Sequence, residues 1–137
     1  MKSNFKLIDN YAISFNGHFI DLHNNFDFVK MARNTEKNTV SLFWKKSSGK
    51  WASKSTINKV ELHIIGVNYF NEISGSNSKD KDTLMDATYY PKSLRSENDT
   101  VTSSQEPQED DDVIFKFEDG RIIRLNGALI EASIDQA

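Results

Sequence analysis

The sequence predicts an antiparallel all-β fold, a sandwich or a partly open barrel of about seven to eight strands. Three observations predict it. Apolar and polar residues alternate in several short stretches, which is the period of a half-buried strand. Turn-forming residues separate these stretches at short intervals. No stretch of ten or more residues has a 3.6-residue apolar period, so long helices are not expected.

The first strands are expected before residue 46. Residues 5–8 and 11–15 form a short pair around Asp9-Asn10, and Gly17 ends the second of them. Residues 39–45 alternate cleanly, whereas residues 26–33 form a less regular partner strand. Residues 34–38 between them have the composition of a hairpin loop.

A long strand is expected over residues 57–70, after a turn at residues 47–49. Val60, Leu62 and Ile64 lie on one side of the alternation. Gly66 interrupts the run, and a glycine inside a strand indicates a bulge or a bend.

Residues 74–112 differ from the rest of the chain. They contain both prolines, many serines and the tract Glu109-Asp110-Asp111-Asp112, but few apolar residues. Such a composition buries too little apolar surface to offset the entropy of ordering, so we expect a long, flexible acidic insert. Residues 83–90 within it form either one helical turn or a short strand.

A three-strand meander is expected at the C-terminal end of the chain. Residues 113–117 alternate and are followed by Asp119-Gly120, a dipeptide typical of a type I′ hairpin turn. Residues 122–125 form the returning strand, Asn126-Gly127 is a second turn of the same kind, and residues 128–134 form the last strand.

Composition limits the classes of protein that the chain can represent. A chain of 137 residues predicts a single domain, with a body at 5–70 and 113–134 and the insert at 74–112. The chain has no cysteine, which excludes disulfides and thiolate sites. No apolar run reaches the ~20 residues that span a bilayer and the first ten residues hold no signal-peptide apolar region, so we expect a cytoplasmic protein.

Charge is distributed unevenly along the chain. Residues 1–70 carry ten Lys/Arg against five Asp/Glu, a balance of +5. Residues 71–112 carry four against eleven (−7) and residues 113–137 carry three against four (−1), which gives the net charge of −3. The sequence therefore describes a basic body with an acidic insert, and such an insert is either a solubilising loop or an interaction segment.

Catalytic and metal chemistry find little support in the sequence. His18, Asp21 and His23 lie close together, but on an extended strand His18 and Asp21 point to opposite faces, and a metal site would need a turn there or His63 from the long strand. The chain has no G-x-S-x-G motif and no glycine-rich phosphate loop. We therefore expect no enzyme, no cofactor and no metal.

Two stretches carry a resemblance to a known group of proteins. VSLFW at residues 40–44 is followed by VELHIIGVNYF at 60–70, and VIFKFEDGRIIRL at 113–125 comes before a last strand at 127–133. This pattern resembles uncharacterised bacterial β domains, some of which are grouped with immunity proteins of polymorphic toxin systems. The resemblance implies a β domain that binds and inhibits a protein toxin.

The first functional hypothesis is a non-enzymatic protein-binding domain, an immunity-type inhibitor whose acidic loop occupies a basic site on a toxin domain. Its candidate residues are five acidic residues and two aromatic anchors: Glu106, Glu109, Asp110, Asp111, Asp112, Tyr89 and Tyr90.

The alternative hypothesis is a domain that binds a small ligand or single-stranded nucleic acid through an aromatic and basic hairpin. Its candidate residues are Trp44, Lys46, Lys50 and Trp51.

Overall fold

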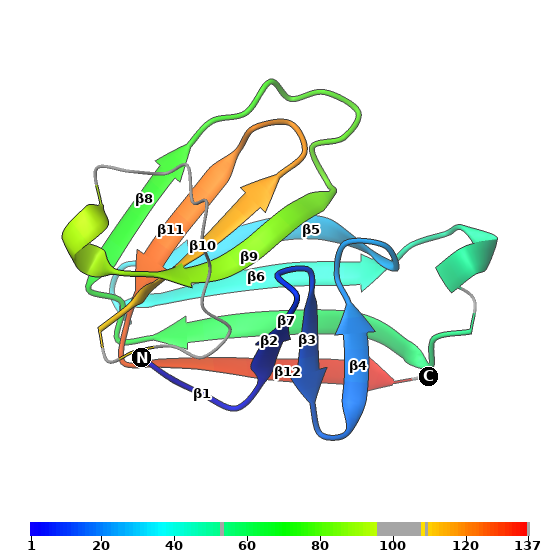
Figure 1. Ribbon diagram of the computed structural model, residues 1–137, viewed down its shortest axis with the longest axis horizontal. Helices are drawn as coiled ribbons and strands as arrows, with labels where there is room; N and C mark the ends of the chain where they lie inside the picture. Colours follow the sequence, from blue (N-terminus) through cyan, green and yellow to red (C-terminus); the bar gives the residue numbers. More distant parts are fainter. Residues whose placement is uncertain (53, 96–107, 109, 137) are drawn as a thin grey trace.

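Twelve strands form three sheets in the computed structural model, which describes residues 1–52, 54–95, 108 and 110–136 (Figure 1). The predicted all-β class is confirmed. The five-stranded sheet has the order β1 (Lys2–Ser3), β12 (Leu129–Gln136), β7 (Ile57–Ile65), β6 (Thr39–Lys46), β5 (Phe26–Asn34). The four-stranded sheet has the order β8 (Tyr69–Ile73), β11 (Ile122–Asn126), β10 (Asp112–Phe117), β9 (Leu84–Tyr90). The three-stranded sheet has the order β2 (Lys6–Ile8), β3 (Ala12–Phe15), β4 (His18–Asp21).

The inner faces of the sheets share one apolar core. Alternate residues of β6 and β7 are buried, as their sequence pattern predicts. Aromatic rings join the two larger sheets, since the Phe28 and Phe117 ring centroids are 4.7 Å apart and those of Trp44 and Phe115 are 6.2 Å apart. The three-stranded sheet lies beside β9 and in front of β7 and β12 in Figure 1, and its apolar residues extend the same core.

The expected strand at residues 57–70 is two strands in two sheets. β7 ends at Ile65 and β8 begins at Tyr69, and Gly66 between them has φ +68°, a left-handed conformation that glycine adopts without strain. Of the two expectations for Gly66, the bend is confirmed and the bulge is wrong, because the chain crosses here from one sheet to the other.

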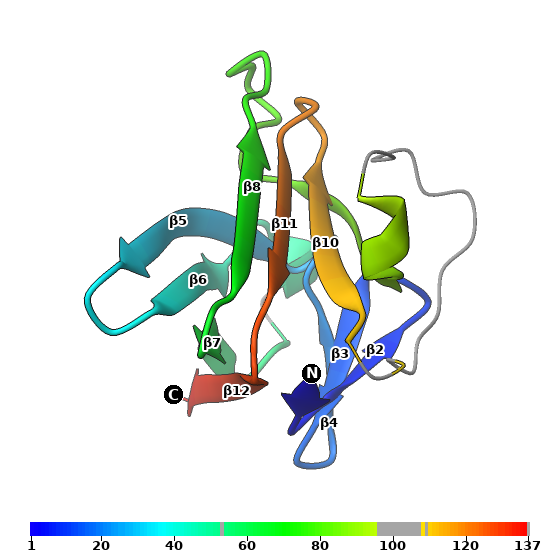
Figure 2. The same ribbon diagram turned by 90° about the vertical axis from the view of Figure 1, so that its left-hand side faces the viewer.

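The expected C-terminal meander is also divided between sheets. β10 and β11 form the predicted hairpin, but β12 pairs with β7 in the five-stranded sheet. The crossing lies at Gly127, where a Cβ would come within 2.9 Å of the Ile64 side chain. Gly66 and Gly127 thus mark one place where a long antiparallel ribbon bends from one sheet into the other (Figure 2).

Both turns that were assigned as type I′ differ, and Asn126-Gly127 is not a hairpin turn, because β11 and β12 belong to different sheets. Asp119-Gly120 is a turn, but among its two residues only Gly120 has a positive φ (91°), so it is not type I′. Asn16-Gly17 has positive φ at both residues and joins β3 to β4, a strand that the sequence did not reveal.

The acidic insert contains a regular strand. β9 pairs with β10 along nearly its whole length, and the short 3₁₀ helix η2 (Lys92–Leu94) follows it. Of the two alternatives for residues 83–90, the short strand is confirmed, whereas residues 96–107 and 109 lie outside the described residues. A second 3₁₀ turn, η1 (Lys50–Ala52), connects β6 to β7. In the described part of the chain, no helix is long and apolar enough to cross a membrane.

Candidate functional site

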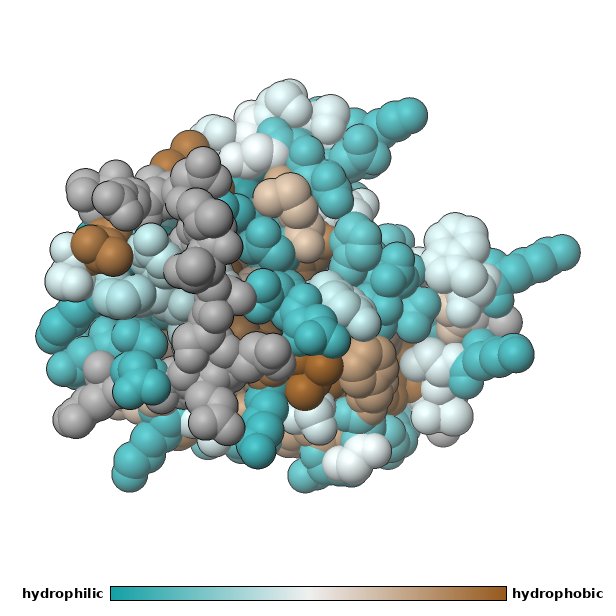
Figure 3. All heavy atoms as spheres, viewed as in Figure 1, coloured by the Kyte–Doolittle hydropathy of each residue, from teal (hydrophilic) through white to brown (hydrophobic). Residues whose placement is uncertain are grey.

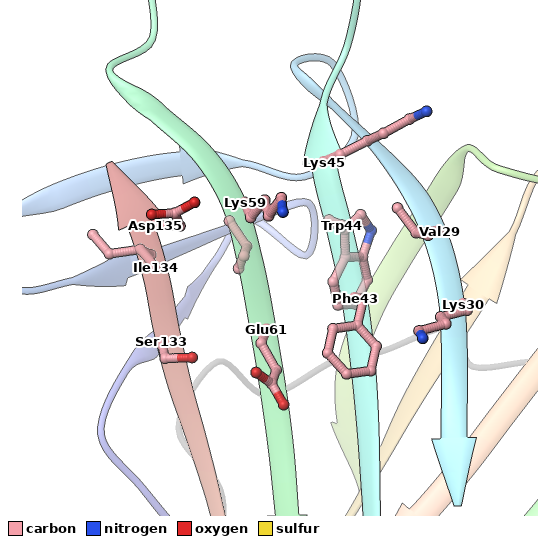
Figure 4. Close-up of a pocket in the computed structure, with 11 residues that line it drawn as sticks. Val29, Lys30, Phe43, Trp44, Lys45, Lys59, Glu61, Ser133, Ile134 and Asp135 are labelled. Atoms are coloured by element: carbon pink, nitrogen blue, oxygen red, sulfur yellow. The ribbon is translucent and has the colours of Figure 1, made fainter. Parts of the chain in front are cut away.

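A groove of about 490 Å³ crosses the outer face of β5, β6, β7 and β12, on the side away from the core (Figure 4). Its apolar side chains on this face are Val29 and Phe43. Charged side chains surround this lining, and they come from all four strands: Lys30, Lys45, Lys59, Glu61 and Asp135. We call these seven residues the outer-face groove.

A β-bulge in β5 places two residues in the groove. Phe28 pairs with Trp44 and Lys30 pairs with Phe43, so Val29 is an extra residue on β5. Figure 4 shows Val29 and Lys30 on the same side of the sheet as Phe43. Without the bulge, strict alternation would turn one of them toward the core. Val29 is 50% exposed, which is unusual for a residue of its kind in a regular strand.

Cross-strand register organises the groove into two rows. Lys30, Phe43 and Glu61 lie side by side on β5, β6 and β7, with the Lys30 Nζ 5.2 Å from the centroid of the Phe43 ring. The next row contains charged residues on four strands: Asp27, Lys45, Lys59 and Asp135. Each row therefore combines cations with carboxylates across the sheet.

The pairing of Lys45 with Lys59 is unfavourable for the sheet itself. Like charges directly opposite each other on neighbouring strands are destabilising. Among the described residues, neither lysine has an ion-pair partner within 4.0 Å, although Asp27 and Asp135 occupy the adjacent strand positions. Local rules of this kind are broken most often where a protein binds another molecule.

A serine and a histidine are close together on the same face. Ser41 Oγ lies 2.6 Å from His63 Nδ1, and Glu61 Oε1 is 3.9 Å from the same ring nitrogen. In a hydrolytic triad the carboxylate binds the ring nitrogen opposite the one facing the serine. Here the Ser41 hydroxyl and the Glu61 carboxylate both lie next to Nδ1 of His63. The three side chains therefore form a contact between neighbouring strands and do not have the geometry of a triad.

The histidines do not converge. His18 Nε2 lies 3.5 Å from the Gln136 side chain, and His23 Nδ1 lies 2.6 Å from the Leu84 carbonyl oxygen. Asp21 accepts hydrogen bonds from the backbone of His23 and Asn24. Across the described ranges, no three His, Asp or Glu side chains are grouped closely enough to hold a metal ion.

Asp112, a candidate of the acidic-loop hypothesis, is completely buried. Its carboxylate accepts hydrogen bonds from Arg95 (2.9 and 3.0 Å), Arg124 (2.7 Å) and Asn126 (2.8 Å). Arg124 is also buried, and it donates to the carbonyls of Pro91 and Leu94. We call Asp112, Arg95, Arg124 and Asn126 the Asp112 cluster.

The cluster lowers the pKa of Asp112. Burial alone would raise the pKa, because it penalises the charged form, but the hydrogen bonds from Arg95, Arg124 and Asn126 together outweigh burial. The Arg95 guanidinium also lies 3.8 Å from the centroid of the Tyr69 ring, which further orders this side chain. Asp112 is therefore a structural carboxylate, and its prediction as a partner-binding residue is corrected.

The other residues of that hypothesis are not gathered on one surface. Asp111 is buried, and Asp110 is exposed and lies 3.5 Å from the Lys92 ammonium. Tyr89 is only 2% exposed and is corrected as a surface anchor. Tyr90 is half-buried, with the Arg124 guanidinium 5.6 Å from its ring. Glu106 and Glu109 lie outside the described residues.

The residues of the alternative hypothesis are also separated. Trp44 is 1% exposed with its ring in the core, so it cannot stack on a ligand. Lys46 is half-buried and donates to the carbonyl of Ser55. Trp51 and Lys50 are exposed on η1.

The outer-face groove was not predicted from the sequence, although one signal pointed to it. The irregular alternation of residues 26–33 is the mark of the bulge that exposes Val29 and Lys30. No sequence pattern indicated that β12 contributes to the groove, because the expected meander pairs the last strand with β11.

Comparison with known proteins adds no relative: no family model, no curated sequence and no solved structure matches the chain.

Proposed function

We propose that the chain is a non-enzymatic protein-binding domain, and that its partner docks on the outer-face groove. One observation carries the proposal: an open groove of about 490 Å³ combines an apolar lining with charges that lack ion-pair partners in the described structure. Exposed apolar side chains with a polar rim are typical of protein-interaction surfaces.

The mixture of charges favours a protein partner over a polyanion in this groove. Glu61 and Asp135 lie beside the three lysines and would repel closely spaced phosphates. A protein surface can offer an acidic group to Lys45 and Lys59 while placing an apolar side chain against Val29 and Phe43.

This arrangement reverses the charge expected of the partner. The acidic-loop hypothesis predicts a basic partner for residues 106–112. In the structure, however, Asp111 and Asp112 are buried, and Asp110 lies beside Lys92. In the part of the chain that the structure describes, Lys45, Lys59 and Asp135 have no ion-pair partner within 4.0 Å. We therefore propose that the partner presents an acidic residue to the two lysines.

An immunity-type inhibitor, as the sequence resemblance implies, is one protein-binding domain of this kind. In that case the groove would cover an acidic patch of the toxin. A cytoplasmic location is part of the same proposal, and a chain without cysteine suits a reducing compartment.

The proposal is tested by affinity capture followed by identification of the captured protein. We expect the full chain to retain a partner that Lys45→Glu/Lys59→Glu loses by about tenfold or more, because truncation or reversal at an interface charge pair costs a few kcal/mol. Lys79→Glu/Lys81→Glu makes the same change of charge at exposed loop positions and should retain the partner.

Two results would contradict the proposal. Equal capture by all three proteins would place binding outside the groove. Loss of capture only after Glu106→Gln/Glu109→Gln/Asp110→Asn would return recognition to the acidic tract.

A further inference from the structure

Trp51 is an exposed aromatic residue held in a fixed position. Its side chain is 68% exposed, yet its Nε1 donates a hydrogen bond of 2.7 Å to the backbone carbonyl of Asn24. The indole also lies directly over Gly49, where a Cβ would overlap the ring. Two separate contacts therefore orient the ring, although most of its surface faces solvent.

Trp51 offers a ligand the exposed surface of its ring. Because the indole N–H is already bonded to Asn24, the ring has no polar group left for a ligand. A rigid aromatic face with no hydrogen-bonding demand is suited to stacking, which tolerates any planar partner.

The part of the sequence that contains Trp51 is rich in lysine and has no acidic residue, although the Asp21 carboxylate is bonded to Asn24 in the fold. Residues 45–60 contain five lysines and no Asp or Glu. Lys45 and Lys59 form the last pair of the β6–β7 ladder, and the connection that follows carries Lys50, Trp51 and Lys54, all exposed. In Figure 3 hydrophilic side chains project from the right-hand end of the molecule, where η1 lies in Figure 1.

We propose that Trp51, Lys50 and Lys54, which we call the Trp51 corner, bind single-stranded nucleic acid. A base stacks on the Trp51 indole, and the neighbouring phosphates lie against the lysines. The pattern combines a planar contact with several cations, which matches a chain of bases joined by phosphates better than an acidic peptide. This site is distinct from the outer-face groove, and it does not depend on the proposed protein partner.

The proposal relocates the aromatic contact that the sequence suggested. Trp44 is in the core, and the Lys46 ammonium donates a hydrogen bond to the Ser55 carbonyl. Lys46 thereby holds the end of the connection that presents Trp51, and Lys50 and Lys54 are exposed in this connection.

The two tryptophans allow a direct fluorescence test with the full chain. We expect an oligothymidylate of about 15 nucleotides, at about 20 mM salt, to quench tryptophan emission to saturation in the micromolar range. Trp51→Ala should abolish the quenching and weaken binding of the labelled oligonucleotide, measured by anisotropy, by about fivefold or more. Trp44→Phe should keep both signals, because Trp44 is buried.

Charge variants test the second half of the site. Lys50→Glu/Lys54→Glu keeps the indole and should weaken binding by about tenfold, whereas Lys79→Glu/Lys81→Glu should leave it unchanged. Raising the salt to about 200 mM should weaken binding to the wild-type chain. Thermal unfolding of each variant checks that the fold is retained.

Several results would overturn the proposal. One is an oligonucleotide that neither quenches emission nor changes anisotropy. Another is a Trp51→Ala chain that binds as tightly as the wild type. Equal binding of poly-glutamate would show a general attraction of anions, and equal binding of thymidine monophosphate would show a site for a small ligand.

Discussion

Two groups of charged residues in this molecule differ in burial and in the number of their partners. In the Asp112 cluster, the buried carboxylate has three side-chain donors at 2.7–3.0 Å. In the row that contains Lys45 and Lys59, two cations lie opposite each other without ion-pair partners in the described structure. The comparison teaches that the buried carboxylate of Asp112 has its partners within the chain, whereas the exposed charges of Lys45 and Lys59 remain available to another molecule.

The cost of burial explains the difference. Removing a carboxylate from water costs several kcal/mol unless hydrogen bonds and an opposite charge replace the solvent. The Asp112 cluster meets this requirement and fixes the chain on both sides of residues 96–107, because Arg124 bonds Pro91 and Leu94 while Asn126 bonds the Asp110 carbonyl. On the outer face, water solvates each lysine, so no internal partner is required.

The largest expected effect comes from breaking the buried group. Asp112→Ala leaves the guanidinium of Arg124, which is fully buried, without its carboxylate. We expect the free energy of unfolding, measured by urea denaturation, to fall by about 3–5 kcal/mol. The matched control is Asp110→Ala, which removes an exposed ion pair with Lys92 and should cost no more than about 1 kcal/mol. Equal losses in the two variants would mean that the cluster is not structural.

Lowering the pH is expected to have an intermediate effect on the free energy of unfolding. The folded-state pKa of Asp112 is lowered, so its stabilisation is present above the unfolded-state pKa of about 3.9 and is lost as pH falls through the lower folded value. The difference in unfolding free energy between the wild type and Asp112→Asn should therefore shrink below about pH 4.

The quantity to measure is the difference in unfolding free energy between the wild type and Asp112→Asn. The stability of either protein alone also depends on Asp86, whose protonation has the opposite effect on stability. Burial raises the pKa of Asp86, Lys116 lowers it in part, and Glu118 raises it further. Protonation of Asp86 as pH falls therefore favours the folded state, and it does so in both proteins. A difference that stays constant down to pH 2 would contradict the assignment to Asp112.

The smallest expected effect comes from the exposed pair. Lys45→Thr/Lys59→Thr removes two like charges at neighbouring positions, so the unfolding free energy should change by less than about 0.5 kcal/mol. The same variant should lose the partner captured by the wild type. A loss of stability above about 1 kcal/mol would show that these lysines support the sheet, and the contrast with the Asp112 cluster would disappear.

Sequence reasoning predicted the strands better than the sites. The alternation over residues 39–45 placed Val40, Leu42 and Trp44 on the core face, and all three are buried. Composition alone made Asp112 and Tyr89 look like surface residues, because an acidic, serine-rich stretch is usually solvated. The buried partners Arg124 and Asn126 are 12 and 14 residues away from Asp112 along the chain, so no local pattern links them to it.

By itself, the sequence determined the all-β class and the hairpin loop at residues 34–38, because side-chain alternation and turn chemistry are local properties. The tertiary structure alone decided which sheet each strand joins, which acidic residues are buried, and how the bulge at Val29 opens the outer-face groove. Alternation specifies the face of a strand, but the neighbour of a strand depends on residues far away in the chain. The pairing of β12 with β7 after the bend at Gly66 and Gly127 depends on such distant residues.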